Sequence, residues 1–437
     1  MTDADVVGLA PALILAAGAL VAALLAIPLR IEPRLLAWVG AVAGAAAAVT
    51  AATIGAGPSA LSGSMVRDGA SVFFVAAISA VAAAVLAVAA ADPRRSGRDR
   101  SEPALVLVSA SGGALAVSSS DLIVLAVGLV ILAVPLYAQA ARRSPRNLLL
   151  GASSCVVVLL GTVLVYVATG ETSYAGLGRA AVSQPYLAGL ALVLAGLAVQ
   201  TVLAPGQRGS LVVNVAIVGA LLRFVAATRS GAVALDWTAS FAVLAALAIA
   251  VASLAALTER RLRRLVGYAT IAQLGYVAAA SAAFAPPEAV FALCASAAIG
   301  LGSFGVLAVL PQDEPVLGDL AGLARQRPIL VLGLGVMVLG AIGVPPTAGF
   351  VAKIYVLEAA LRAQLLWLAV LGALATVVSA ASYVRLVLVC FAAPRPDAVA
   401  PPRSRIATAI VVLAALAVLG AGLVRGPLFD AALTVRY

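Results

Sequence analysis

The sequence contains a single lysine, Lys353, among its 28 lysine and arginine residues. It lies in the segment GVPPTAGFVAKIYVLEA, just after a pair of prolines and within a long apolar run. An ionisable side chain inside a membrane span is costly and by default marks a functional site. A lysine amine, unlike an arginine guanidinium, can release its proton when it is taken out of water. We therefore expect Lys353 to handle protons or ions, the alternative being a lysine that extends to the membrane surface without a role.

Two proline-containing segments predict breaks in long apolar helices. Pro345 and Pro346 interrupt the run that carries Lys353, and Pro205 follows Gln200 in the segment AGLAVQTVLAP. Proline disrupts the helix around it, and a broken membrane helix leaves backbone carbonyls that line a polar cavity. We expect a broken helix at both places.

Further polar side chains lie inside or beside apolar segments. The uncharged ones that would line a hydrated path are Gln200, Asn214, Tyr268, Gln273 and Tyr276. Such groups also tie membrane helices together by hydrogen bonds, so each has both interpretations. Glu358 follows Lys353 by five residues, too far round a helix for an ideal ion pair, so it would line the path or lie at the membrane surface. Arg223 and Arg385 lie near the ends of apolar segments, where they would reach the surface or pair with a carboxylate.

The composition requires a membrane protein. Of the 437 residues, 64% are hydrophobic and 11% are charged, whereas about a quarter of the residues in soluble domains are charged. So few charges cannot cover a water-soluble surface, which excludes a soluble enzyme, a nucleic-acid-binding protein and a disordered chain. The sequence has no histidine and three scattered cysteines, so it offers no haem, zinc or other metal ligand set. We expect it to bind no redox cofactor of its own.

Apolar runs between charged, proline-rich or glycine-rich segments predict about fourteen membrane-spanning helices in an all-α polytopic fold. The expected spans are 6–28, 35–55, 70–91, 103–119, 121–141, 147–169, 182–205, 210–228, 238–257, 264–284, 288–310, 327–361, 364–391 and 405–424. No connecting segment is long enough to form a separate soluble domain. Residues 1–437 are therefore expected to form one membrane domain.

The arginines predict the orientation of these spans. Nineteen of them fall on one side and six on the other, which also carries both chain ends. Basic residues concentrate in cytoplasmic loops. We therefore expect a multi-pass protein of the cell inner (plasma) membrane with cytoplasmic arginine-rich loops and both termini outside. Its surroundings would be the lipid bilayer, and no nucleic acid is expected as a partner.

The spacing of the broken spans predicts an internal repeat. The seventh and twelfth spans are both interrupted by proline, and they are five spans apart. Because five is odd, corresponding spans would cross the membrane in opposite directions, as in an inverted-topology repeat. We expect the repeats to be 103–228 (helices 4–8) and 238–391 (helices 9–13), preceded by helices 1–3 in 1–100 and followed by helix 14 in 405–424.

Three segments resemble one known family of membrane subunits. They are GLVILAVPLYAQAA (128–141), RRLRRLVGYATIAQLGY (260–276) and GLARQRPILVLGLGVMVLGAIGVPPTAGFVAKIYVLEAAL (322–361). They are similar to the fifth-, tenth- and twelfth-helix regions of subunit N of the proton-pumping NADH–quinone oxidoreductase, whose fold is shared by cation/proton antiporter subunits. The similarity extends over roughly 120–392.

The resemblance implies a function within a larger enzyme. It implies two inverted five-helix repeats that form half-channels joined by a polar axis, and proton transfer coupled to quinone reduction elsewhere. This chain would be a cofactor-free membrane subunit of an NADH:quinone oxidoreductase, with other membrane subunits of a complex I-like or antiporter-like assembly as partners. Quinone, NADH, flavin and iron–sulfur clusters are expected in partner subunits.

The sequence departs from the family at several titratable positions. The fifth-helix glutamate of the family falls on Val130, its seventh- and eighth-helix lysines fall on Gln200 and Asn214, and a tenth-helix histidine falls on Gln273. The twelfth-helix lysine is retained as Lys353. We therefore expect a divergent member whose first half-channel is impaired. The alternatives are a subunit of a multi-subunit cation/proton antiporter and a structural paralogue that does not pump.

Overall fold

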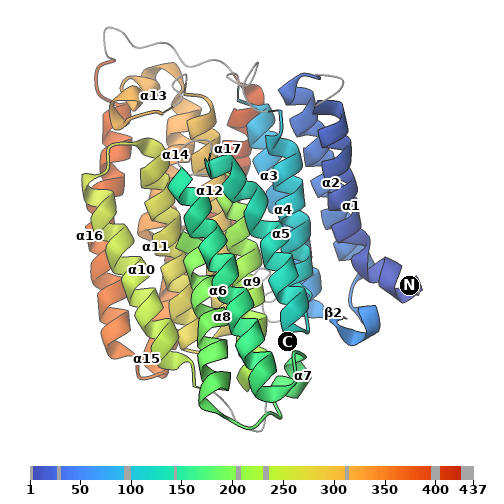
Figure 1. The fold of residues 1–437 in the computed structure, drawn as a ribbon. Coiled ribbons are helices and arrows are strands. Elements are labelled where there is room, and N and C mark those ends of the chain that lie inside the picture. The colour runs from blue at the N-terminus through green and yellow to red at the C-terminus, as the bar shows by residue number, and fades with distance from the viewer. Residues whose placement is uncertain are drawn as a thin grey trace.

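The structure, a computed structural model, is a bundle of helices that run roughly parallel to one another (Figure 1). It describes residues 3–26, 31–92, 100–141, 145–202, 208–229, 236–310, 314–394 and 404–424. In the first half the long helices are α1 (Asp3–Ala26), α2 (Pro33–Ile54), α3 (Gly69–Ala90), α4 (Glu102–Val117), α5 (Leu122–Ala141), α6 (Pro145–Thr169), α8 (Gln184–Val202) and α9 (Ser210–Arg229). In the second half they are α10 (Thr238–Thr258), α11 (Leu262–Ala282), α12 (Pro286–Ala308), α14 (Pro328–Ile342), α15 (Ala348–Arg362), α16 (Leu366–Cys390) and α17 (Arg405–Leu423).

The helices have the length and composition of membrane spans. Within the described ranges, eleven are long and apolar enough to cross a bilayer, and three shorter apolar helices cover Glu102–Val117, Gln184–Gln200 and Pro328–Ile342. Large aliphatic side chains such as Leu332, Val167 and Val377 lie exposed on the outside of the bundle, where lipid would meet them. The chain is therefore a polytopic α-helical membrane protein, as its composition predicts.

Helix α9 lies at the centre of the bundle. Its residues from Ser210 to Val225 are all buried, and it packs against α3, α4, α8 and α12. Helices can approach closely here because small residues line the contacts. Gly219 of α9 shows this, since a Cβ atom there would lie 2.7 Å from the Phe74 ring of α3.

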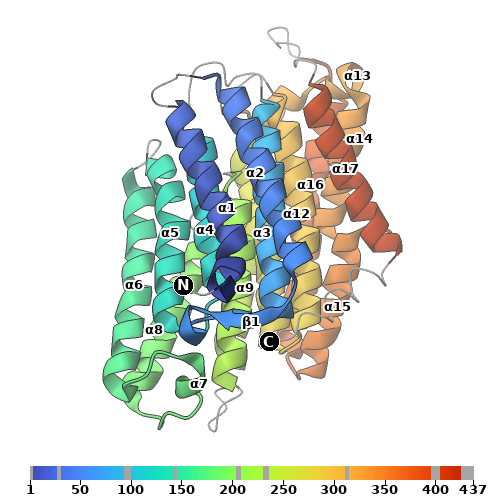
Figure 2. The same ribbon diagram turned by 90° about the vertical axis from the view of Figure 1, so that its right-hand side faces the viewer.

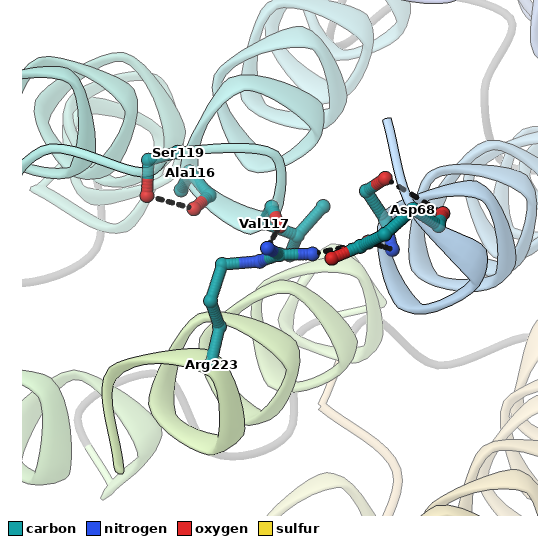
Figure 3. A network of polar contacts seen from close by, with 6 residues as sticks. Asp68, Ala116, Val117, Ser119 and Arg223 are labelled. Atoms are coloured by element: carbon teal, nitrogen blue, oxygen red, sulfur yellow. Dashed lines mark hydrogen bonds and ion pairs between the residues drawn. The ribbon is translucent and has the colours of Figure 1, made fainter. Parts of the chain in front are cut away.

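Two ion pairs, one buried and one partly buried, hold α9 to α3, one near each end of the pair of helices. Arg208 pairs with Asp92 just beyond the end of α3. At the other end Arg223 donates through Nη2 to Asp68, the N-cap of α3, at 2.6 Å, and through Nε to the Val117 carbonyl at 2.7 Å (Figure 3). Arg223 thus pairs with a carboxylate, one of the two expectations for it.

Several short elements lie outside the long helices, and one of them, a hairpin, departs from the all-α expectation. β1 (Gly57–Ala60) and β2 (Met65–Arg67) form an antiparallel hairpin joined by the 3₁₀ turn η1 (Leu61–Gly63). Figure 2 shows this hairpin crossing one end of the bundle beside α1 and α3. Three further short helices lie between spans: α7 (Tyr174–Leu177), η3 (Leu317–Leu320) and α13 (Leu323–Gln326).

The long apolar segment around Lys353 is broken, as its prolines predict. Helix α14 ends at Ile342 and α15 begins at Ala348. Gly343 caps α14 in the left-handed region at φ 85°, which favours glycine, and the Thr347 hydroxyl receives the Phe350 amide at the start of α15. The second expected break, at Pro205, lies outside the described residues, and α8 before it is continuous to Val202.

Candidate functional site

The amine of Lys353 is buried at the break between α14 and α15. Its side chain is 6% exposed. Nζ donates to the carbonyls of Ala341 and Ile342, both at 2.9 Å, and to the Thr376 hydroxyl of α16 at 3.4 Å. The lysine therefore turns inward and does not extend to the bundle surface.

The end of α14 explains why these carbonyls accept the amine. The last four carbonyls of a helix have no partner within it, and they carry the negative end of the helix dipole. The amides of Gly343 and Val344 both bond the Leu339 carbonyl at 2.9 Å. The next turn is broken, so the carbonyls of Ala341 and Ile342 remain for Lys353. The broken helix thus builds a site for a cation from its own backbone.

The side chains of Tyr276 and Thr376 complete the surroundings of the amine. Nζ lies 4.7 Å from the centre of the Tyr276 ring, within the range of a cation–π contact. The Tyr276 hydroxyl donates to the Gly372 carbonyl at 2.7 Å and lies 2.9 Å from the Thr376 hydroxyl, which itself donates to the Gly372 carbonyl at 3.0 Å. Lys353, Thr376 and Tyr276 therefore form one connected polar chain across α15, α16 and α11.

Gln273 joins this chain from α11. Its amide Nε2 donates to the Ala341 carbonyl at 3.1 Å, the same oxygen that accepts the Lys353 amine. Of the residues singled out in the sequence, the structure brings together Lys353, Gln273 and Tyr276. It adds Thr376, which the sequence did not mark because threonine is common in apolar helices.

Two other candidate residues lie apart from the lysine. Glu358 is on an exposed face of α15, where its carboxylate is 4.0 Å from Arg362. It does not face Lys353, and its position matches the interfacial alternative. Tyr268 is half-buried on α11 and packs against a cluster formed by Ala252, Ile271 and Ala272.

The described side chains around Gln200, in the first half of the chain, are uncharged. Gln200 of α8 is buried and donates to the Cys155 sulfur of α6 at 3.5 Å. Val130 of α5 packs against the cluster that contains Cys155 and Tyr137. The Gln200 Oε1 and the Tyr137 hydroxyl have no hydrogen-bond partner within the described residues. These groups can bind water, but none of them carries a charge near neutral pH.

An apolar cavity lies between the two halves. It has a volume of about 80 Å³ and is lined from α8, α9, α10 and α11. Its wall includes Ala198, two residues from Gln200, and Leu274, next to Gln273. Asn214 is buried in α9, one turn from Val218 of the same wall. Apart from the Phe241 ring and Ser281 its lining is aliphatic, so it offers few partners to a water molecule.

A second cavity extends from the lysine site toward η3. Its volume is about 40 Å³, and α11, α12, α14 and α16 line it together with Leu320 of η3. Ala341, whose carbonyl binds the lysine, lies on its wall, and so does Tyr383 of α16. The Tyr383 hydroxyl is buried and has no partner among the described residues. Tyr383 carries no sequence signal, and its burial in the same cavity wall as Ala341 becomes evident only in three dimensions.

The charge of the site comes from the lysine. In the described parts of the chain no carboxylate forms an ion pair with Lys353. Its charged form is stabilised by carbonyls, a hydroxyl and a ring face, whereas burial destabilises that charged form. An amine in such surroundings can bind one proton and release it, which arginine cannot do at neutral pH.

The sequence matches a known family over most of the bundle. Residues 119–379 match the family described as NADH:quinone oxidoreductase/Mrp antiporter, TM. This range begins just before α5 and ends within α16, so it includes the lysine site and both broken-helix candidates.

Curated relatives carry one name. The chain is 32% identical over 383 residues to NADH-quinone oxidoreductase subunit N 2 of Roseiflexus castenholzii, with 77% of each chain covered. It is 33% identical over 393 residues to NADH-quinone oxidoreductase subunit N of Geobacter metallireducens, with 83% of this chain and 84% of the relative covered.

Solved structures share the fold. A chain of respiratory complex I from Thermus thermophilus with bound aureothin superposes with a TM-score of 0.81 at 28% identity, covering 96% of this chain and 98% of that one. A chain of the Mrp complex from Dietzia sp. superposes with a TM-score of 0.80, covering 98% of this chain and 96% of that one. Its identity is 20%, so it shows a common fold alone.

Proposed function

We propose that this chain is a proton-translocating membrane subunit of a complex I-like assembly, because it belongs to the NADH:quinone oxidoreductase/Mrp antiporter transmembrane family. The relatives from Roseiflexus castenholzii and Geobacter metallireducens, both above 30% identity, are named as subunit N of NADH-quinone oxidoreductase, which favours this assembly over an antiporter. The chain would contribute no redox group of its own. NADH, flavin, iron–sulfur clusters and quinone would act in partner subunits, and other membrane subunits would flank this one.

The buried amine of Lys353 carries the proposal. In its charged state the ammonium would be held by the carbonyls of Ala341 and Ile342, as the 2.9 Å distances allow. On release of the proton the Thr376 hydroxyl, 3.4 Å away, could turn from the Gly372 carbonyl and donate to the neutral amine. The site can therefore alternate between two protonation states with the partners it already has.

We further propose that protons reach Lys353 through the cavity that contains Tyr383. A buried hydroxyl without a partner costs free energy, and water that enters the cavity would remove that cost. The cavity connects Ala341 with Leu262 and Leu320, at the end of the bundle where the arginine-rich segment 259–264 lies. If these arginines are cytoplasmic, protons would enter from the cytoplasm.

The first half would support the assembly without conducting protons. Val130, Gln200 and Asn214 carry no charge, and the cavity lined by α8, α9, α10 and α11 offers few polar groups that could pass a proton from them to Lys353. At these three positions a relay finds no side chain that can hold a proton in transit. The half-channel formed by 103–228 would therefore be impaired, and the half formed by 238–391 would hold the working site.

The proposed topology has fourteen crossings in the plasma membrane. The eleven long spans and three shorter apolar helices of the described residues would supply them, α14 and α15 together making one crossing. Both termini would lie outside and the arginine-rich loops in the cytoplasm. Helices 1–3 and helix 14 would flank the two inverted repeats.

The test measures proton transfer by the whole complex in sealed vesicles. We expect Lys353→Met to lower the number of protons moved per NADH oxidised, and Lys353→Arg to lower it as well, because guanidinium keeps its proton. Arg362→Gln, on the exposed face of the same helix, is the matched control and should leave the yield unchanged. Gln200→Leu should also leave it unchanged. An unaltered yield in both lysine variants would instead favour a structural subunit that does not pump.

A further inference from the structure

The guanidinium of Arg67 ends in an open groove between the hairpin and α1, α2 and α3. Its Nε and Nη1 are buried, and neither has a hydrogen-bond partner in the described parts of the chain. The side chain crosses the face of Gly57 on the paired strand, where a Cβ atom would overlap the guanidinium. A charged group with two buried and unpaired N–H donors is costly unless a ligand meets them.

The neighbouring carboxylates have other partners. Asp68, next in the chain, bonds the Ser71 amide at 2.8 Å and pairs with Arg223 at 2.6 Å. Asp5 accepts the Leu61 amide at 2.7 Å. No ion pair joins Arg67 to a carboxylate of the described residues. The groove therefore presents positive charge that a negative ligand would complement.

The rest of the groove is suited to a hydrocarbon chain. Aliphatic side chains of Val7, Pro11, Ile54 and Val75 line it. Ile54 is the last residue of α2, so the groove begins where the apolar helices end and continues along them. Charge at the helix ends and aliphatic walls below it are the arrangement of a lipid at a membrane surface.

We propose that this groove binds one acidic phospholipid, with its phosphate on Arg67 and one acyl chain along α1, α2 and α3. A guanidinium presents paired N–H donors in one plane and binds phosphate oxygens through two of them. Ser118 also lines the groove and provides a further polar group for a headgroup, whereas the Ser71 hydroxyl donates to the Asp68 carbonyl. A free phosphate would leave the aliphatic walls uncovered, and a zwitterionic lipid would bring no net charge.

The test counts lipids bound to the full chain. The chain is purified in non-ionic detergent, freed of lipid and titrated with phosphatidylglycerol or phosphatidylcholine, and native mass spectrometry measures each bound state. We expect the wild-type chain to bind its first phosphatidylglycerol about tenfold more tightly than phosphatidylcholine, a difference typical of charge-assisted hydrogen bonds. Arg67→Gln should remove this preference, and Arg67→Lys should retain part of it because the charge stays.

Matched variants separate the groove from charge in general. Gly57→Ala keeps Arg67 but displaces its guanidinium, so it should also remove the preference. Arg179→Gln, which removes an exposed arginine outside the groove, should keep it. The proposal is overturned if the preference survives in Arg67→Gln and Gly57→Ala, or if inorganic phosphate at equal concentration displaces the lipid. It is also overturned if cross-linking in the intact complex joins this position to a protein carboxylate.

Discussion

The amine of Lys353 and the side-chain amide of Gln273 share one acceptor, the carbonyl oxygen of Ala341, at 2.9 and 3.1 Å. The lysine comes from α15, the glutamine from α11 and the carbonyl from the end of α14. One carbonyl at the end of α14 therefore joins three helices at the point where the proposed proton carrier lies.

Changing Gln273 to glutamate should trap the proton on Lys353. A carboxylate cannot donate to the Ala341 carbonyl, which both side chains reach, so the ammonium would pair with the carboxylate. A nearby opposite charge stabilises the charged amine. We expect proton transfer by the reconstituted complex to fall about tenfold or more, since one pK unit corresponds to a factor of ten. Gln273→Met, which removes the amide without adding charge, should cost about 1 kcal/mol of stability and keep most of the transfer. Equal transfer by the glutamate and methionine variants would contradict this explanation.

Gly343→Ala should disturb the lysine site through the backbone. Gly343 has φ 85°, and a Cβ atom there would lie 2.9 Å from Cδ of Lys353. We expect a loss of about 1–2 kcal/mol of stability, with lower proton transfer because the amine is pushed from its carbonyls. Gly335→Ala in the same helix is the control, because no atom lies within 4 Å of the added Cβ. It should be neutral or raise the unfolding temperature measured in detergent.

Tyr383→Phe should separate proton access from structural stability. The hydroxyl makes no hydrogen bond within the described residues, so its removal should leave the unfolding temperature nearly unchanged. If the hydroxyl holds water in the path to Lys353, proton transfer should still fall. Tyr276→Phe provides the contrast, because it removes a hydroxyl that bonds both Gly372 and Thr376 and should lower the unfolding temperature. Full transfer by Tyr383→Phe would place the path elsewhere.

The pair formed by Asp68 and Arg223 should make stability depend on pH in acid. Burial raises the pKa of the Asp68 carboxyl, but the hydrogen bond and charge of Arg223, with the Ser71 amide and hydroxyl, outweigh it and hold the pKa below its usual 3.8. A pKa that is lower in the folded state than in the unfolded state stabilises the fold at pH values above the unfolded-state pKa. This contribution is lost as the pH falls through the folded-state pKa. We expect the unfolding temperature of the wild-type protein to drop below about pH 4.

Asp68→Asn tests this assignment. It should lower the unfolding temperature at neutral pH and flatten the acid drop, because no carboxylate remains to be protonated at this position. Adding Arg223→Gln to it should cost less than the sum of the two single changes, since both remove the same pair. An acid profile identical to that of the wild-type protein would assign the drop to other carboxylates.

Much of the helical architecture could be predicted from the sequence because a bilayer sets the length of apolar runs. The expected span 70–91 corresponds to α3 at Gly69–Ala90, and 405–424 to α17 at Arg405–Leu423. The break near Lys353 was also predictable, because Pro345 and Pro346 cannot continue a helix. The hairpin at 57–67 was not, since its glycine- and serine-rich sequence indicates a short loop and carries no strand periodicity.

The site was predictable where one residue differs in kind from its surroundings. Lys353 is such a residue, and Gln273 and Tyr276 lie close to it as candidates. Thr376 and Tyr383 were missed because a hydroxyl in an apolar helix has no sequence signal that tells which neighbour it faces. Their roles depend on the packing of α16 against α11 and α14, which helical periodicity alone does not determine.

The ion pairs that hold α9 to α3 have a consequence for biosynthesis. Asp68 and Asp92 precede their arginines by 155 and 116 residues, so both carboxylates enter the translocon long before Arg208 and Arg223 are translated. The early helices must wait without these partners while five further helices of ten or more residues, α4, α5, α6, α8 and α9, are synthesised. Final docking of the N-terminal third is therefore a late, post-insertion event, and a chain truncated before Arg208 would lack both arginines that pair with the ends of α3.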